Sequence, residues 1–552
     1  MLAQIINCIK FCGAFELALR GHDEKDSSAN PGIFRGLINF TAELDSALKE
    51  HMSEATVFKG TSKDIQNDLL QCMLEVYHEK VKEEIGKADY VSVIADETTD
   101  ISSLTQMVIV LRYLLSNGKP VERFWSFVNP NNCNAASLST CVKDVLSQVI
   151  HDKNKLISQS YDGASVMSGG NAGVHVLIRQ DYPYAHYVHC YAHKLNLIMA
   201  QATSQNTQVR IFFADINEIP AFFSNSPQRV RVLDDIVGKR FPGISNIRWN
   251  FKSRLVETVY EHRGSLINCL EEIQEQSKQT STITQARGLL LRIQQPVFLF
   301  WLKVFHLIMP HVDILYNQLQ KKQIDSVSAK KAITDFQQNI QQIRDSIDTI
   351  DVNPPSEKKR KVETSETRKI AAKEICDTVI TQAADRFKFT GHLTASKLFV
   401  TENFNKYNKE FPEMLLNETH KAYPFINEPR LRTELEIIYM RQDFRNTSSA
   451  SVLLKFIIEN NLERTFSESV KLLKVLVTIP MTTSEAERCF STLKRVKTFL
   501  RSTMGEDRLT ALAMLSIEKQ VISDMDDFNE RVIDKFAQKK ERRMDFLPHH
   551  TI

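Results

Sequence analysis

The stretch YVSVIADETTDISSLTQMVIVLRYLLSNGKPVERFWSFVN, residues 90–129, decides the fold. It contains three short runs rich in β-branched and aromatic residues, separated by turn-like segments such as SNGKP. These features predict three strands, of which the last two form a hairpin. In residues 1–88, before this stretch, apolar positions recur at helical spacing, which predicts a helical N-terminal region.

The residues that follow alternate between predicted helices and strands up to residue 204. A helix over SLSTCVKDVLSQVIH precedes the strand KLISQSYD, a second helix, the short strand AHYVHC and the helix AHKLNLIMAQAT. A three-strand meander followed by such alternation predicts a mixed sheet with helices packed on it. This is the order of the ribonuclease-H-like fold, although periodicity alone does not separate that fold from other α/β sheets. We therefore expect an α/β core whose first part spans residues 89–204.

The second half of the sequence is mostly helical in pattern. Residues 205–450 carry almost no strand signal, which predicts a large all-helical insertion, and the polar, proline-containing segment at about 350–368 predicts an exposed linker within it. Apolar helical segments return over 451–522 and are expected to complete the core. Residues 523–552 read as a tail.

Composition and cysteine usage restrict the function only loosely. The 552 residues carry a formal net charge of +3, so a DNA-binding surface would require basic residues gathered on one face. The nine cysteines form no CxxC pair, which predicts free thiols in a reducing compartment and no ordinary zinc finger. We find no stretch long and apolar enough to predict a membrane span, so a membrane partner is not expected.

Two acidic residues directly follow predicted strands. Asp96 ends the run VSVIAD, and Asp162 ends LISQSYD. Open sheets bind ligands at the carboxyl ends of their strands, although Asp also commonly begins a turn. Both interpretations stay open for each residue alone, whereas two such positions in neighbouring strands favour a shared site.

A third acid lies in IPMTTSEAERCFSTLKRVKTFL, residues 479–500, which predicts a late helix. Thr482 and Glu485 have the spacing of a capping box at its start. Its apolar stripe consists of Phe490, Leu493, Val496 and Leu500. Glu487 continues this stripe, where a carboxylate needs a cation or a metal as partner. An ordinary surface pair with Arg488 is the alternative.

Three converging carboxylates have a clear chemical use. Hard divalent cations such as Mg²⁺ prefer oxygen ligands, and two such ions can activate an attacking oxygen and stabilise a leaving one in phosphodiester cleavage. The sequence contains no Walker-type phosphate loop and no nucleophile elbow. A P-loop enzyme or a hydrolase with a nucleophilic serine is therefore disfavoured.

Several segments resemble a known superfamily. VSVIADETTDISSLTQMVIVLRYL, SYDGASVMSG and YVHCYAHKLNLI are similar to the catalytic region of hAT transposase relatives that carry a domain of unknown function beside a TTF-type zinc finger. MTTSEAERCFSTLKRVKTFLRSTMGEDRLTALAMLSIE looks like the hAT C-terminal dimerisation region. The resemblance reaches from near the N-terminus to about residue 520. It implies a ribonuclease-H-like core interrupted by a helical domain before its last helix.

The resemblance also implies roles for individual residues. Asp96 and Asp162 match the two catalytic aspartates and Glu487 matches the catalytic glutamate, so these three are the expected ligands of Mg²⁺ or Mn²⁺. Cys190 and His193 match a CxxH element near the active site. From the residues themselves, packing or orientation of the site is favoured over zinc binding, because no second ligand pair follows.

Two further elements concern DNA and localisation. Arg248 and Trp249 match the RW element associated with DNA handling, whereas a lone Trp is more often a core anchor. The basic run Lys358, Lys359, Arg360 and Lys361, in the expected linker, favours nuclear import. A solvated linker without such a role is the alternative.

Two functions are therefore expected as competitors. The first is a transposase-like enzyme that binds DNA and performs metal-dependent strand cleavage and transfer. The second is a domesticated, catalytically inactive nuclear protein that dimerises and binds DNA or chromatin, a hypothesis favoured by the missing zinc-finger pattern. Dimerisation is expected to involve residues of the C-terminal region, such as Leu512, Leu515 and Ile517.

Overall fold

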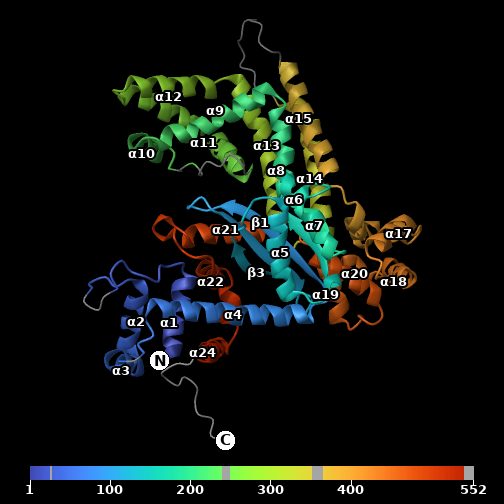
Figure 1. Cartoon of the computed structure of the whole chain (residues 1–552). Coiled ribbons are helices and arrows are strands. Elements are labelled where there is room, and N and C mark those ends of the chain that lie inside the picture. Colours follow the sequence, from blue (N-terminus) through green and yellow to red (C-terminus); the bar gives the residue numbers. More distant parts are fainter. Residues whose placement is uncertain (25–27, 57, 239–240, 242–248, 351–364, 540–552) are drawn as a thin grey trace. The chain divides into compact units, whose positions relative to one another are not determined.

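The computed structural model describes residues 1–552 except 25–27, 57, 239–240, 242–248, 351–364 and 540–552 (Figure 1). Its contacts divide the chain into two compact units. Unit 1 comprises Met1–Cys190 and Ala395–Ile552, and unit 2 comprises Tyr191–Thr394. The expected insertion, 205–450, overlaps unit 2 without sharing its bounds, since residues from 395 onward group with unit 1.

Unit 1 is built on one mixed five-stranded sheet. Its strands are β1 (Val91–Thr99), β2 (Thr105–Leu114), β3 (Pro120–Val128), β4 (Leu156–Tyr161) and β5 (His186–His189). The order across the sheet is β3-β2-β1-β4-β5, with β1, β2 and β3 antiparallel in sequence and β4 and β5 added parallel to β1. The predicted α/β class, with a meander followed by alternating helices and strands, is confirmed.

Helices from both ends of the chain surround this sheet. The first part contributes α1 (Leu2–Ala14), α2 (Ile33–Leu44), α3 (Ser46–Glu54), α4 (Lys63–Lys87), α5 (Ala135–Val149), α6 (Ser165–Ser168) and α7 (Val174–Asp181). The second part contributes α16 (Phe404–Tyr407), α17 (Glu413–Ala422), α18 (Glu428–Met440), α19 (Ala450–Glu459), α20 (Ser467–Thr478), α21 (Ser484–Val496), α22 (Glu506–Ile517), α23 (Lys519–Ser523) and α24 (Phe528–Gln538).

Strand alternation assigns different helices to the two faces of the sheet. The hydroxyl of Tyr113 on β2 donates to Glu84 Oε2 of α4 at 2.7 Å. The adjacent Arg112 points the opposite way and donates to the carbonyl of Val477 in α20. Helices α20 and α21 therefore cover the face opposite to α4, and both contact the central strands.

Side chains from α22 and from Glu518, the residue that follows it, cover the edge strand β3. The N–H of Phe124 donates to Glu518 Oε1 at 2.7 Å, that of Phe127 to Thr510 Oγ1 at 3.2 Å, and that of Asn129 to Glu506 Oε1 at 3.1 Å. An open strand edge would otherwise offer these donors to another chain. The C-terminal region thus completes the core, burying apolar side chains of α22 such as Leu509 and Met514.

Unit 2 is formed by helices, with no strand among its described residues. They are α8 (Tyr191–Ser204), α9 (Thr207–Ser224), α10 (Pro227–Ile236), α11 (Trp249–Gln276), α12 (Thr280–Ile293), α13 (Pro296–Leu319), α14 (Ser326–Ser346) and α15 (Ser365–Arg386). An aromatic cluster lies at the centre, where the ring centroid of Phe212 is 5.3 Å from that of Phe298 and 5.6 Å from that of Phe305.

Helix α13 corrects the expectation that no stretch is long and apolar enough for a membrane span. By length and composition it qualifies, and it is the one such helix among the described residues. Half of its apolar window is buried inside the protein, as in the core helix of a soluble domain, and its Trp301 is almost inaccessible. One helix of this kind is weak support for a membrane span.

Candidate active site

The two strand-end aspartates lie at the same end of the same sheet. Strands β1 and β4 run parallel, with Ile94 paired to Ser160. Asp96 and Asp162 each follow their paired residue by two positions, so alternation places both on one face. That face is the one covered by α20 and α21, because Ser92, on the same side of β1, is the partner of Arg112.

The glutamate of α21 completes this group. Burial, followed by the charges of Asp162 and Glu487, raises the pKa of Asp96 to about 8, although a hydrogen bond from the N–H of Glu97 opposes the rise. That N–H donates to Asp96 Oδ1 at 2.9 Å. Because like charges raise a carboxyl pKa only at short range, three acids distant in sequence share one electrostatic environment.

Neither strand-end aspartate is neutralised by a basic side chain in the described part of the chain. Asp96 accepts from the N–H of Glu97, and Asp162 Oδ1 accepts from the N–H of Ala164 at 3.1 Å. The latter is a turn-forming contact, as the alternative interpretation of Asp162 required. Turn formation uses one carboxylate oxygen and leaves the second for another role.

Cys190 fixes the start of α21 beside Asp162. Its Sγ accepts a hydrogen bond from the N–H of Thr483 at 3.3 Å, and its own N–H donates to the carbonyl of Tyr161 at 2.9 Å. The segment before α21 is thereby tied to the last residue of β4. This geometry gives Cys190 a positioning role, while His193 is half-buried in α8 of unit 2.

The start of α21 differs from the predicted capping box. The N-cap is Thr483, without a side-chain cap, and Thr482 Oγ1 lies 3.0 Å from Ser484 Oγ. Glu485 is buried and accepts from Arg488 Nε at 2.6 Å. The helix therefore begins one residue later than a cap at Thr482 would place it.

A buried ion pair fixes the residue that follows the other end of α21. Lys497 Nζ donates to Asp100 Oδ2 at 2.6 Å, and the two side chains are 2% and 1% exposed. Asp100 also accepts from Ser102, Leu104 and Gln106. Although burial opposes it, the bonds from Lys497 and Ser102 hold the pKa of Asp100 at about 2. The turn between β1 and β2 is thus joined to α21.

The predicted length of this helix is corrected at the same place. Helix α21 ends at Val496, and a 3₁₀ turn, η6 (Phe499–Arg501), follows. Leu493 and Val496 are buried as expected, whereas Leu500 is 92% exposed and lies outside the apolar stripe. Lys497, the residue directly after α21, donates to Asp100 at the point where the helix ends.

A second buried network joins α21 to β2 and β3. Arg112 Nη1 donates to Glu122 Oε1 at 2.8 Å, and Arg488 Nη2 lies 3.7 Å from Glu122 Oε2. Burial, together with the charge of Glu485, raises the pKa of Glu122 against the effect of Arg112. Arg488 therefore pairs with Glu485 and lies near Glu122.

The oxygen donors of this site are of the kind that binds a divalent metal ion, but among the described residues they are not arranged around one common position. Oxygen atoms from Asp96, Asp162 and Glu487 are those that Mg²⁺ and Mn²⁺ prefer. Among the described residues, no three His, Cys, Asp or Glu side chains stand close enough to hold a metal as placed. Ligation would require the three side chains to rotate inward, which would offset the repulsion that raises the pKa of Asp96.

Sequence reasoning missed one acidic neighbour of this group. Glu97 follows Asp96, and burial together with the charge of Asp162 raises its pKa. Its Oε2 is buried without a hydrogen-bond partner among the described residues. The adjacency of two acids after an apolar strand was the available signal.

The residues expected to handle DNA fall in unit 2. Trp249, the first residue of α11, is 4% exposed and packs edge-on against Phe213 at a centroid distance of 5.3 Å. Lys252 Nζ lies 4.0 Å from its ring centroid. This is the core-anchor position, so base stacking by Trp249 would require it to move. Arg248 lies outside the described residues, as do Lys358, Lys359, Arg360 and Lys361.

Comparison with known proteins places both parts of the site in recognised regions. Residues 1–173, with Asp96 and Asp162, match the model of the "ZMYM1/FAM200, RNase-like domain". Residues 434–521, with Glu487, match the "hAT family C-terminal dimerisation region". The second match supports self-association.

Two proteins of the same name, one human and one from mouse, are similar to this chain. The human "52 kDa repressor of the inhibitor of the protein kinase" is 20% identical over 98% of this chain and 77% of its own length. The mouse protein of the same name is also 20% identical over the same shares. The resemblance to hAT-derived proteins inferred from the sequence is confirmed by these matches.

Proposed function

We propose that this chain, which carries two regions of hAT-derived proteins, has a ribonuclease-H-like nuclease core that binds DNA and cleaves and transfers its strands with Mg²⁺ or Mn²⁺. The observation that carries the proposal is the electrostatic coupling of Asp96 to both Asp162 and Glu487. Buried carboxylates that repel one another are unfavourable for folding alone. Their convergence favours a ligand of opposite charge.

Different residues of the chain would orient the carboxylates and hold α21 in position. When bound, the metal ions supply Lewis-acid stabilisation of the attacking and leaving oxygens. The N–H of Glu97 orients Asp96 through Oδ1, and the N–H of Ala164 orients Asp162. Cys190 and the Lys497–Asp100 pair hold α21, and hence Glu487, against the strands. Orientation by fixed contacts of this kind is what metal catalysis requires of a protein.

The test is metal-dependent nicking of DNA by the purified chain. Asp96→Asn, Asp162→Asn and Glu487→Gln should each lower the rate at least about a hundredfold, since each removes a ligand of the shared ions. Asp144→Asn, on the exposed side of α5, is the matched control and should cleave like the wild type. Circular dichroism checks that each variant is folded. Cleavage that survives in all three variants would refute the proposal.

A second candidate function is a domesticated, catalytically inactive nuclear regulator. The name of the two relatives, which describes a repressor, favours it. It predicts DNA or chromatin binding without cleavage at any Mg²⁺ or Mn²⁺ concentration. Fractionation of cells would test the nuclear localisation, with a variant in which Lys358, Lys359, Arg360 and Lys361 are replaced by alanine as the probe of import.

Self-association requires different probes from those suggested by the sequence. Leu512 and Leu515 are 4% and 1% exposed, so charged substitutions there would disrupt the core rather than an interface. Phe499 and Leu500, within the matched dimerisation region, are 83% and 92% exposed. Replacing both with aspartate should convert dimers to monomers in light scattering while preserving the unfolding transition. Dimers that persist would exclude this turn from the interface.

A further inference from the structure

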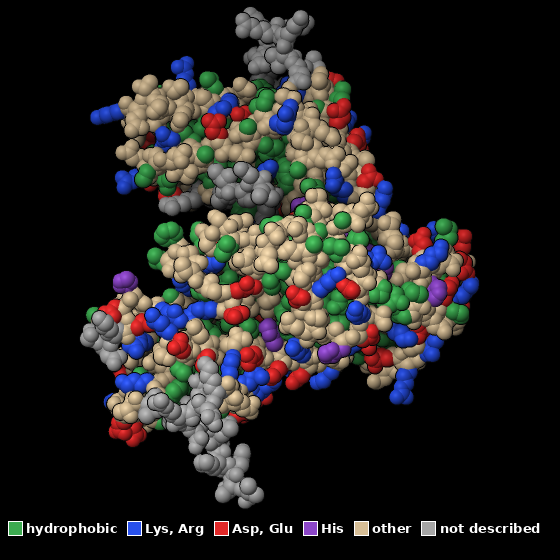
Figure 2. Space-filling view, in the orientation of Figure 1, with side chains coloured by type: hydrophobic (Ala, Val, Ile, Leu, Met, Phe, Trp, Pro, Cys, Tyr) green, Lys and Arg blue, Asp and Glu red, His purple; other side chains and the backbone are tan. Residues whose placement is uncertain are grey.

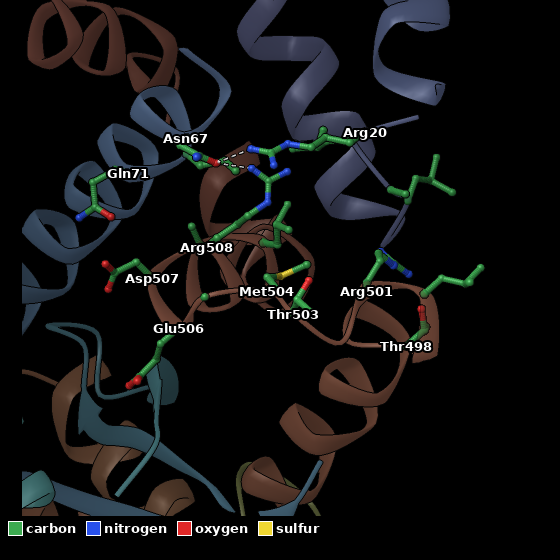
Figure 3. A pocket seen from close by; sticks show the side chains of 18 of the residues that line it. Arg20, Asn67, Gln71, Thr498, Arg501, Thr503, Met504, Glu506, Asp507 and Arg508 are labelled. Carbon is green, nitrogen blue, oxygen red and sulfur yellow. Dashed lines mark hydrogen bonds between the residues drawn. The ribbon is translucent and has the colours of Figure 1, made fainter. Parts of the chain in front are cut away.

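A cavity of about 1100 Å³ opens in unit 1 away from the three carboxylates (Figure 3). It is lined by residues after α1, from the start of α4, from the loop that joins α21 to α22, from α22 itself and by the residue that follows α24. Its volume is at the upper end of the range of ligand pockets. The basic lining residues are Arg20, Arg501, Arg508 and Lys539.

Two of these arginines converge on a single acceptor. Arg20 Nη2 donates to Asn67 Oδ1 at 3.5 Å, and Arg508 Nη1 donates to the same oxygen (Figure 3). A guanidinium carries five N–H donors. Within the described residues, Arg20 and Arg508 make no other hydrogen bond and no ion pair. Most of their donors are therefore available at the wall of the cavity.

This arrangement differs from that of two arginines beside the sheet, Arg112 and Arg123. Arg112 has Glu122 at 2.8 Å, and Arg123 has Glu84 at 3.4 Å. No ion pair of Arg508 occurs among the described residues, and burial followed by the charge of Arg20 lowers its pKa to about 10, against the weaker, opposite effect of the charge of Glu24. A partly buried cation beside a second cation gains stability when an anion is bound between them.

The acidic lining residues restrict where an anion can bind. Glu506 Oε1 accepts from the N–H of Asn129 at 3.1 Å, and Figure 3 shows its side chain pointing away from the arginine pair. Asp68 and Asp507 also line the cavity. The favourable position is hence the end at which Arg20 and Arg508 meet. In Figure 2, basic side chains gather with acidic ones at the lower left, over the N-terminal helices of unit 1.

We propose that the Arg20–Arg508 end of this cavity binds a phosphate group of the DNA backbone. Guanidinium groups in a pair match the oxygens of a phosphate and hold it by charge and by parallel hydrogen bonds. A free polyphosphate shares this chemistry. Assignment of the phosphate to DNA rests on the proposed function, whereas the anion site itself does not.

The path of the chain connects this site to Glu487. Helix α21 carries Glu487 near its start and leads directly into Thr498 and Arg501 of the cavity lining. From Glu487 to Val496 the helix rises about 14 Å, at 1.5 Å per residue. A backbone phosphate at the pocket would therefore fix the register of a strand presented to the carboxylates.

The experiment measures the affinity for a short DNA duplex across a series of salt concentrations. Arg508→Gln and Arg20→Gln should each weaken binding by roughly tenfold at moderate salt and lower the slope of log affinity against log salt by about 1, without a change in sequence preference. Arg508→Lys keeps the charge and should recover most of the affinity. Lys455→Gln, exposed on α19, is the charge-matched control and should leave the slope unchanged.

A second arm uses inorganic pyrophosphate and needs no DNA. Pyrophosphate should raise the melting temperature of the wild type and of Lys455→Gln, but not of Arg508→Gln. If this holds while DNA binding is absent from every protein, the phosphate site stands with a free polyphosphate as ligand, and the proposed function fails. If neither the salt slope nor the pyrophosphate response depends on Arg508 and Arg20, the phosphate site is refuted.

Discussion

The buried carboxylates near the two ends of α21 differ in whether a cation is paired with them. Just past its C-terminal end, Asp100 is matched by Lys497 and by several hydrogen bonds, and its pKa lies at about 2. At its N-terminal end, burial and the charges of Asp162 and Glu487 raise the pKa of Asp96 to about 8. The first end has the chemistry of a structural lock. The second is unfavourable for folding alone, which is the property expected of a site completed by a ligand.

The largest effect on folding is expected at the matched end. Lys497→Met leaves Asp100 buried without its cation and should lower the free energy of unfolding by about 3 kcal/mol. Urea denaturation measures this loss, and Lys494→Met, on the exposed side of α21, should change stability by less than about 0.5 kcal/mol. Adding Asp100→Asn to Lys497→Met should recover part of the loss. A small effect of Lys497→Met would erase the contrast between the two ends.

The unmatched end should respond with the opposite sign. In metal-free buffer, Asp96→Asn removes a repelled charge and should stabilise the protein by roughly 1–3 kcal/mol above pH 8. The folded-state pKa of Asp96, about 8, exceeds its ordinary value of 3.8, so the stability from this carboxyl is complete below about pH 4 and is lost as pH rises through 8.

The gain of the variant over the wild type should therefore shrink as pH falls. Chemical denaturation at several pH values, with a chelator present, measures it, and Asp144→Asn serves as the control. Addition of Mn²⁺ should stabilise the wild type and not Asp96→Asn. A variant less stable than the wild type at every pH would show that Asp96 has a structural partner after all.

A smaller effect on stability is expected at Thr510, whose side chain makes hydrogen bonds with uncharged backbone groups. Thr510 Oγ1 accepts from the N–H of Phe127 and donates to its carbonyl at 3.3 Å. Thr510→Val keeps the shape and leaves both backbone groups unsatisfied, which should cost about 1–2 kcal/mol in thermal or urea unfolding. Thr503→Val, at an exposed position, should be neutral. Comparing this loss of unfolding free energy with that of Lys497→Met shows how much more a buried ion pair contributes to stability than a neutral hydrogen bond in this unit.

Local patterns were sufficient to predict most of the fold. Alternation and β-branched content located the strands, and their order predicted that Asp96 and Asp162 would meet at one end of the sheet. Parallel neighbours must end together, so this inference needs only the chain order. The late helix carrying Glu487 was also predicted, and the family resemblance supplied its convergence with the strands.

The contacts that hold α21 could not be predicted in the same way. Arg112 and Lys497 belong to residue types that rarely lie buried, and their partners are distant in the sequence. The apolar role predicted for Leu500 was wrong because α21 ends at Val496, before Leu500. Arg20 and Arg508 come together only in three dimensions, so no sequence spacing marks the cavity.

The covering of β3 by α22 has a consequence for biosynthesis. The residues that accept hydrogen bonds from this strand edge are synthesised late. Glu506, the acceptor for the N–H of Asn129, lies 377 positions further along the chain. At ordinary translation rates that interval lasts roughly 20–80 s. During it, the nascent chain displays an unprotected strand edge, whereas unit 2 is continuous and emerges whole. Chaperone dependence during synthesis should therefore arise from the first 190 residues, and truncation before α22 should yield aggregates.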